Sequence, residues 1–186
     1  EINLLVLAVA TRRHRVALMW TVLDRAGASG APERIALIER FVAAFGKARI
    51  GLLLGDREFI GNAWVASLQT RKIPFVLRLK DNQIIRRDNF PARPVSVLAR
   101  RLEPGRRLIV KQPCRLADGP DTPSLRIVIL RLENRELLVL ATNTKPKAAL
   151  KRYRARWRIE CLFANLKSRG FDLEATHLTI PGKLET

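Results

Sequence analysis

The chain has 186 residues, 47% of them hydrophobic, which is enough for a domain with a substantial core. Lys and Arg number 35 against 17 Asp and Glu, and the resulting formal charge of +18 indicates a polyanionic partner such as nucleic acid. No apolar run approaches the roughly 18 residues of a membrane span, and the first residues do not form a signal peptide, so we expect a cytoplasmic protein that does not enter the membrane.

A charge excess of this size is also compatible with two further kinds of chain. One is a ribosome-associated basic protein, and the second is a chain from a GC-rich genome in which Arg replaces Lys on solvated faces. The two cysteines, Cys114 and Cys161, are too few and too far apart to predict a disulfide scaffold or a metal-ligand pattern.

The first part of the chain alternates between predicted strands and helices. Residues 2–10 and 16–23 are apolar runs joined by a short polar connection, which predicts an antiparallel hairpin buried on both faces. From Glu33 the apolar residues recur at helical intervals until Gly46, so a helix is expected there.

A short apolar strand over residues 50–54 comes next, and it leads directly into Asp56. A buried strand that ends in a carboxylate is how an open α/β sheet presents catalytic groups at its carboxyl edge. Asp56 has a simpler alternative as the N-cap of the helix that follows, predicted from about Gly61 to Gln69. Both interpretations are compatible with the sequence alone.

The middle of the chain is rich in β-structure. Residues 73–80 predict a strand, and residues 83–142 carry many prolines and little helical periodicity. Within that stretch we expect one short strand from about Arg107 and a hairpin formed by residues 125–132 and 136–142. We interpret residues 83–142 as a β-rich insertion in an α/β domain whose mixed sheet is flanked by helices.

A long helix is predicted from about Ala148 to Ser168, because the stretch contains no Gly or Pro. At about 100° per residue, four polar side chains fall within an arc of roughly 60° on one face. These are Tyr153, Arg156, Glu160 and Lys167. The plain alternative for Arg156 and Glu160 is an ordinary i,i+4 ion pair on the helix surface.

The order Tyr, two residues, Arg, three residues, Glu, six residues, Lys resembles the signature of YREK-type DDE transposases of bacterial insertion sequences. The string from Asp56 to Gly61, followed by Trp64 and Leu68, resembles the second-aspartate motif of the same group. The resemblance implies that Asp56 and Glu160 are the second and third metal-binding catalytic carboxylates. It further implies DNA-binding roles for Tyr153, Arg156 and Lys167, with Arg156 and Lys167 on transposon-end phosphates.

The resemblance also implies a ribonuclease H-like fold over residues 1–186, as a single partial catalytic domain. Its parts would be a core (1–82), the β-rich insertion before the last catalytic helix (83–142), that helix (145–170) and a truncated tail (171–186). The first catalytic aspartate of the family lies on a strand before the hairpin, so we expect a fragment, truncated at both ends, that lacks it. Asp24 follows a strand in the wrong place to replace it.

The implied activity is metal-dependent cleavage and transfer of DNA strands at transposon ends. It would use two Mg²⁺ ions, with Mn²⁺ as an alternative, on double-stranded DNA in a nucleoid-associated homodimer. Two alternatives remain, a non-catalytic basic nucleic-acid-binding module and a ribonuclease H-like nuclease without strand transfer. Some family members stack a flipped base on a tryptophan of the insertion, but here the insertion has only Phe90, and Trp157 fits core packing and DNA contact equally well.

Overall fold

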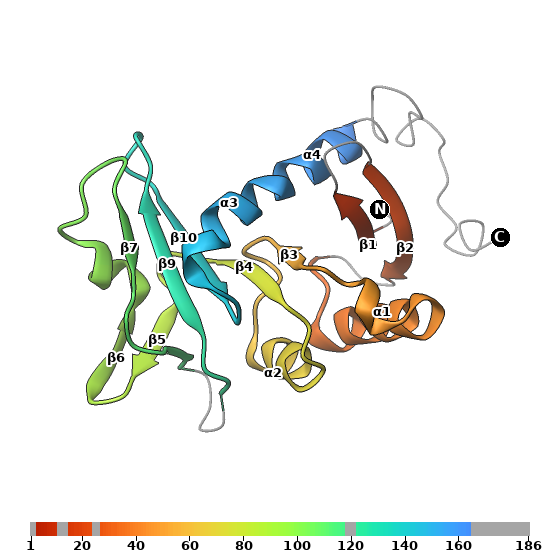
Figure 1. Ribbon diagram of the computed structural model, residues 1–186, viewed down its shortest axis with the longest axis horizontal. Coiled ribbons are helices and arrows are strands. Elements are labelled where there is room, and N and C mark those ends of the chain that lie inside the picture. Colours follow the sequence, from red (N-terminus) through yellow and green to blue (C-terminus); the bar gives the residue numbers. More distant parts are fainter. Residues whose placement is uncertain (1–2, 11–14, 24–26, 118–121, 165–186) are drawn as a thin grey trace. The chain divides into compact units, whose positions relative to one another are not determined.

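The computed structural model describes residues 3–10, 15–23, 27–117 and 122–164 (Figure 1). The chain forms two compact units. The first unit joins Glu1–Gly46 with Arg154–Thr186, and the second is Lys47–Tyr153. No helix within the described ranges is long and apolar enough to cross a membrane.

The first unit contains the predicted hairpin. Strand β1 (Asn3–Ala10) pairs antiparallel with β2 (Arg15–Leu23), and helix α1 (Ala31–Phe45) packs beside them and ends at Gly46, whose φ is 80°. Helix α4 (Trp157–Ala164) contacts both strands. The expectation of burial on both faces is wrong, since the two helices leave several apolar side chains of the hairpin exposed: Leu4, Val16 and Trp20.

The second unit is built on a five-stranded mixed sheet in the order β3-β4-β10-β9-β7. The strands are β3 (Leu53–Gly55), β4 (Phe75–Leu79), β7 (Arg107–Ile109), β9 (Arg126–Arg131) and β10 (Leu137–Thr142). Helix α2 (Asn62–Thr70) connects β3 to its parallel neighbour β4, as a parallel pair requires a crossover, and the other pairs are antiparallel. This mixed sheet flanked by helices confirms the predicted α/β class and is consistent with a ribonuclease H-like fold.

The predicted hairpin of the insertion is β9 and β10, and β10 pairs directly with β4. The insertion therefore extends the central sheet. A second sheet in the order β6-β5-β8 was not predicted; it contains β5 (Ile84–Arg87), β6 (Phe90–Pro94) and β8 (Arg115–Leu116). Its prolines, Pro91 and Pro94, lie on the edge strand β6, where a missing N–H breaks no ladder.

Four 3₁₀ helices complete the described structure: η1 (Lys47–Arg49), η2 (Val95–Ala99), η3 (Pro146–Ala148) and η4 (Arg154–Arg156). The predicted long helix begins where expected, as α3 (Ala149–Tyr153). It then tightens through η4 before continuing as α4, and its expected end near Ser168 lies outside the described residues.

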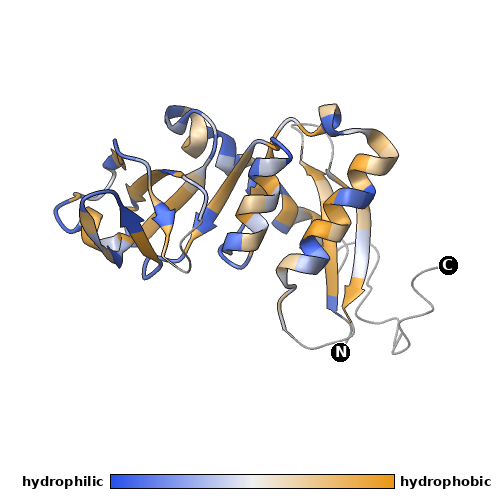
Figure 2. Ribbon diagram, turned by 90° about the horizontal axis from the view of Figure 1, so that it is seen from below, coloured by the Kyte–Doolittle hydropathy of each residue, from blue (hydrophilic) through white to orange (hydrophobic). Residues whose placement is uncertain are grey.

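One part of the core of the second unit lies between the sheet and α3. In Figure 2 the strands of the sheet are mostly apolar, whereas the helices carry both apolar and polar residues. Helix α3 contacts β4 and β10. At this contact the ring of Tyr153 belongs to a cluster of buried side chains from the helix and the sheet: Val76, Val128, Leu140, Ala149 and Tyr153. This packing fixes the position of the α3 end at the face of β4.

Candidate active site

Asp56 follows directly after β3, at the carboxyl end of a parallel strand. Its main-chain carbonyl accepts a hydrogen bond from the N–H of Phe59 at 2.9 Å, which closes a turn. Its side chain stays one-third exposed. The sequence therefore places a solvent-accessible carboxylate at the sheet edge, as predicted.

The turn depends on Gly55. A Cβ at this position would lie 2.7 Å from Cδ2 of Leu77 and 3.0 Å from Cβ of Phe59. The first distance is far below ordinary van der Waals contact, so glycine at this position leaves the space that the Leu77 and Phe59 side chains occupy beside the turn at Asp56.

Three donors converge on one oxygen of Asp56. The N–H of Arg57 lies 2.8 Å from Oδ1, the phenol oxygen of Tyr153 lies at 3.4 Å, and a guanidinium nitrogen of Arg78 lies at 3.8 Å. The carboxylate is thus oriented by groups from the turn, from α3 and from β4.

The alternative role of Asp56 as a helix N-cap is wrong. Helix α2 begins at Asn62, its N-cap is Gly61, and no side chain forms a capping hydrogen bond there. The intervening turn separates Asp56 from the first turn of the helix, so its carboxylate is not used for capping.

Tyr153 is placed by the hydrophobic cluster under α3. Tyr153 is only 6% exposed. Its ring packs with Val76 and Leu140, and its hydroxyl points to Asp56. The structure therefore gives Tyr153 a contact with the carboxylate that the sequence did not predict. Contact with DNA stays a prediction for this residue.

Glu160 lies on α4 in the first unit, where its Oε1 is 2.5 Å from a guanidinium nitrogen of Arg156. The simple i,i+4 ion pair considered from the sequence is therefore present. The Glu160 side chain is 42% exposed and that of Arg156 is 17% exposed. The glutamate thus remains accessible to a ligand while the arginine holds it.

The remaining sequence-based candidates are distributed as follows. Lys167 lies outside the described residues, as does Asp24, which the sequence analysis had already set aside. Asp56 belongs to the second unit and Glu160 to the first. Trp157 is 67% exposed, which excludes the core-packing alternative for this side chain.

Both carboxylates offer hard oxygen ligands of the kind that Mg²⁺ prefers. Each is partly exposed and each lies beside an arginine of its own unit. Within the described ranges, no three Asp, Glu, His or Cys side chains gather at one place.

Arg78 is the site residue that the sequence analysis missed. The register of β3 against β4 aligns Leu54 with Val76 and Gly55 with Leu77, so the next residue, Asp56, comes beside Arg78. The signal available in the sequence was an arginine inside an otherwise apolar strand, three positions after the first residue of that strand. The register of the two strands then places Arg78 on the face that carries the carboxylate.

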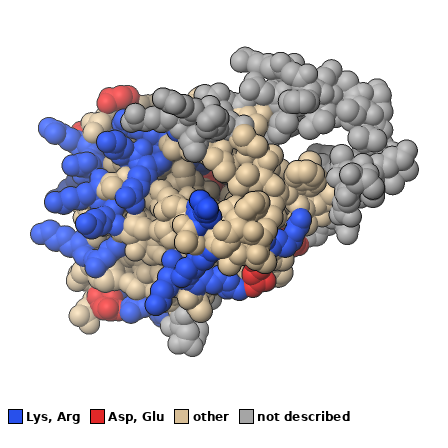
Figure 3. Space-filling view, turned by 45° about the vertical axis from the view of Figure 1, so that its right-hand side comes forward, with Lys and Arg blue, Asp and Glu red and all other residues tan. Residues whose placement is uncertain are grey.

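The charge of the chain is unevenly distributed on its surface. Figure 3 shows Lys and Arg side chains gathered at the left of the view with few acidic ones among them. On the insertion, the Arg87 guanidinium lies 4.3 Å from the centre of the Phe90 ring, which is 47% exposed. An exposed aromatic ring with a guanidinium over it, as in the Arg87–Phe90 pair, suits the stacking of a nucleic-acid base.

The family model described as "Transposase DDE domain" matches residues 4–185. A search of curated protein sequences finds no significant match to the chain.

Proposed function

The chain belongs to the DDE transposase family, and we propose that it is a YREK-type catalytic domain that cleaves and joins DNA strands at the ends of a bacterial insertion sequence. In this proposal Asp56 and Glu160 are metal-binding catalytic residues. Tyr153, Arg156 and Lys167 contact the transposon-end DNA.

The observation that carries the proposal is the position of Asp56. Its carboxylate stands at the carboxyl end of β3, accessible to solvent, with donors from three separate elements directed at its Oδ1. A carboxylate that served only to cap α2 would bond to the first N–H groups of that helix, whereas the cap position belongs to Gly61. An oriented, accessible carboxylate at a sheet edge is typical of a site that holds a cation.

The family generally uses divalent metal ions, which Asp56 and Glu160 would hold; two bound Mg²⁺ ions would supply activation of a water or 3′ hydroxyl and stabilisation of the leaving oxygen. The residues of this chain perform the remaining tasks. Tyr153 and Arg78 orient Asp56, and Arg156 holds Glu160 in place. Arg156 and Lys167 bind phosphate oxygens, since guanidinium and ammonium groups anchor phosphates without taking part in the chemistry.

Metal titration tests whether Asp56 and Glu160 share an ion. Mn²⁺ binding to the chain is measured by calorimetry for wild type, Asp56→Asn, Glu160→Gln and the double variant. If one ion contacts both carboxylates, each single variant weakens binding and the double variant weakens it by less than the product of the two effects. Glu136→Gln, an exposed acid in the turn between β9 and β10, is the control that removes the same charge.

Independent effects of the two substitutions on Mn²⁺ affinity would contradict the shared site. Strand cleavage in the protein that carries this domain gives the second measurement. Undiminished cleavage by Asp56→Asn or Glu160→Gln would remove that residue from the catalytic site.

A non-catalytic nucleic-acid-binding module is the second candidate, because the formal charge of +18 alone favours polyanion binding. Such a module binds DNA in chelator as well as in Mn²⁺ and shows no Mn²⁺ site that depends on Asp56. A nuclease of the same fold is distinguished by its products, since it yields no joined strands with a target plasmid.

A further inference from the structure

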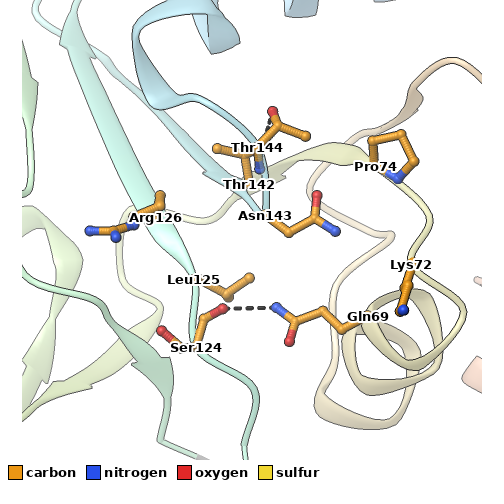
Figure 4. Close-up of a pocket in the computed structure, with 9 residues that line it drawn as sticks. All are labelled: Gln69, Lys72, Pro74, Ser124, Leu125, Arg126, Thr142, Asn143 and Thr144. Atoms are coloured by element: carbon orange, nitrogen blue, oxygen red, sulfur yellow. Dashed lines mark hydrogen bonds between the residues drawn. The ribbon is translucent and has the colours of Figure 1, made fainter.

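The second unit has an open pocket of about 490 Å³ at the beginning of β4. Its charged lining residues are Lys72 and Arg126, and no acidic side chain lines it. Figure 4 shows Lys72 and Arg126 on opposite sides, with the polar side chains of Gln69, Ser124 and Asn143 between them. The Arg126 guanidinium is turned away from these side chains and donates to the carbonyl of Lys111 at 3.2 Å. A pocket of this size and charge suits a phosphorylated ligand.

The pocket lies at the other end of the strands from Asp56. Strand β4 starts at Phe75, beside the pocket, and runs in parallel with β3 toward Asp56. The antiparallel strand β10 ends at Thr142, opposite Val76, and leads into the pocket through Asn143. The pocket is therefore separate from the candidate active site.

Lys72 has a backbone conformation that favours glycine. Its φ is 53°, and it follows Arg71, the C-cap of α2. The N–H of Lys72 bonds to the carbonyl of Gln69 and that of Ile73 to the carbonyl of Leu68, both at 2.9 Å, which is the Schellman pattern. Glycine is the usual residue here because it has no Cβ, so the presence of lysine places a cation at the pocket against the local backbone preference.

The pocket wall is held by hydrogen bonds to the backbone. The Asn143 side chain accepts from the N–H of Phe75 at 2.9 Å and donates to the carbonyl of Ile73 at 2.8 Å. The Gln69 amide donates to the carbonyl of Ser124 at 2.8 Å. These bonds tie the end of α2, the start of β4 and the start of β9 together, so the two cations are presented from a rigid frame.

We propose that this pocket binds a phosphodiester group of a nucleic-acid strand through Lys72, with Arg126 on the facing rim, as a second contact site at the opposite ends of the strands from Asp56. The inference rests on the proposed nucleic-acid partner but not on the metal chemistry. A strand bound at both edges would pass along the second unit and be positioned by two separate sets of residues.

Replacement of Lys72 by glycine separates binding from folding. Lys72→Gly removes the cation and relieves the backbone, so its thermal midpoint should equal or exceed that of wild type while DNA affinity falls. Arg135→Gly is the matched control. Arg135 is also basic and left-handed (φ 67°), but it lies in the turn at the far end of the β9–β10 hairpin from the pocket.

The measurement is fluorescence anisotropy of a labelled duplex, in chelator and over a range of salt. We expect Lys72→Gly to weaken binding several-fold and to make the slope of log affinity against log salt shallower by about one unit. Arg135→Gly should leave both quantities close to wild type. Equal losses in the two variants, or no loss in Lys72→Gly, would overturn the pocket assignment.

Amide resonances of Ser124 and Thr144 identify the bound species. They should shift on addition of the duplex in wild type and not in Lys72→Gly. Shifts caused by inorganic phosphate but not by the duplex would show a free-anion site and overturn the strand proposal. Failure of wild type to bind any duplex would instead remove the proposed nucleic-acid partner.

Discussion

The phenol oxygen of Tyr153 lies 3.4 Å from Oδ1 of Asp56, although 97 positions separate the two residues. The end of α3 is thereby linked to the end of β3 within one unit. The contact is long for an O–H···O hydrogen bond, so its contribution to folding is small and its main effect is on the orientation of the carboxylate.

Tyr153→Phe should therefore fold normally and weaken the site. The ring keeps its place in the cluster under α3, so we expect a change of less than about 1 kcal/mol in the free energy of unfolding. Mn²⁺ affinity, measured by calorimetry, should fall several-fold because one group that orients Asp56 is lost. Tyr153→Ala is the contrasting variant, since truncating a buried aromatic ring costs about 3–5 kcal/mol; similar stability of the two variants would contradict the packing.

Arg78→Gln tests the second group that orients Asp56. The ion pair is partly exposed, so its loss should change the free energy of unfolding by no more than about 1 kcal/mol. If Arg78 steadies the carboxylate and also binds phosphate, the DNA affinity of Arg78→Gln in chelator should be lower than that of wild type. The control is Arg115→Gln, which breaks an exposed ion pair with Asp88 in the insertion. Identical affinities of wild type and Arg78→Gln would exclude a DNA contact at this position.

The sequence predicted the elements of this site better than their connections. Periodicity and apolar runs indicated the hairpin, α1, α2, β4 and the β9–β10 pair because burial on one or both faces leaves a clear pattern. That β10 would pair with β4 could not be predicted, since strand order depends on contacts distant in sequence.

The site shows the same limit. Asp56 could be identified from its place after a buried strand, whereas Arg78 became visible only through the register of β3 and β4. The burial of Tyr153 could not be predicted either. An amphipathic helix pattern does not show which residues at the edge of the apolar face contact a sheet.

Gly55→Ala should destabilise the second unit. The added Cβ would meet Cδ2 of Leu77 at 2.7 Å and Cβ of Phe59 at 3.0 Å, so the turn or the strand must shift. We expect a loss of about 1–3 kcal/mol in urea unfolding, together with weaker Mn²⁺ binding because Asp56 follows directly. Gly51→Ala is the control, since nothing lies within 4 Å of a Cβ there; equal losses in the two variants would refute the close-approach argument.

The stability of the fold should also fall at high pH because of Cys114. This thiol is fully buried, and burial raises its pKa from 9.0 to about 11, against the opposing effect of Arg87 and Arg126. Since the folded state keeps the proton that the unfolded state releases, the contribution of Cys114 is complete below pH 9.0 and is lost as the pH rises to about 11.

The loss should amount to roughly 2–3 kcal/mol over that interval. Urea unfolding of wild type and Cys114→Ala at several pH values isolates it, because the remaining groups that titrate in the same range are common to both proteins. The alanine variant should show a flatter dependence of the unfolding free energy on pH above 9.0 and the same dependence below it. Parallel curves over the whole range would mean that the thiol is accessible to solvent in the folded state.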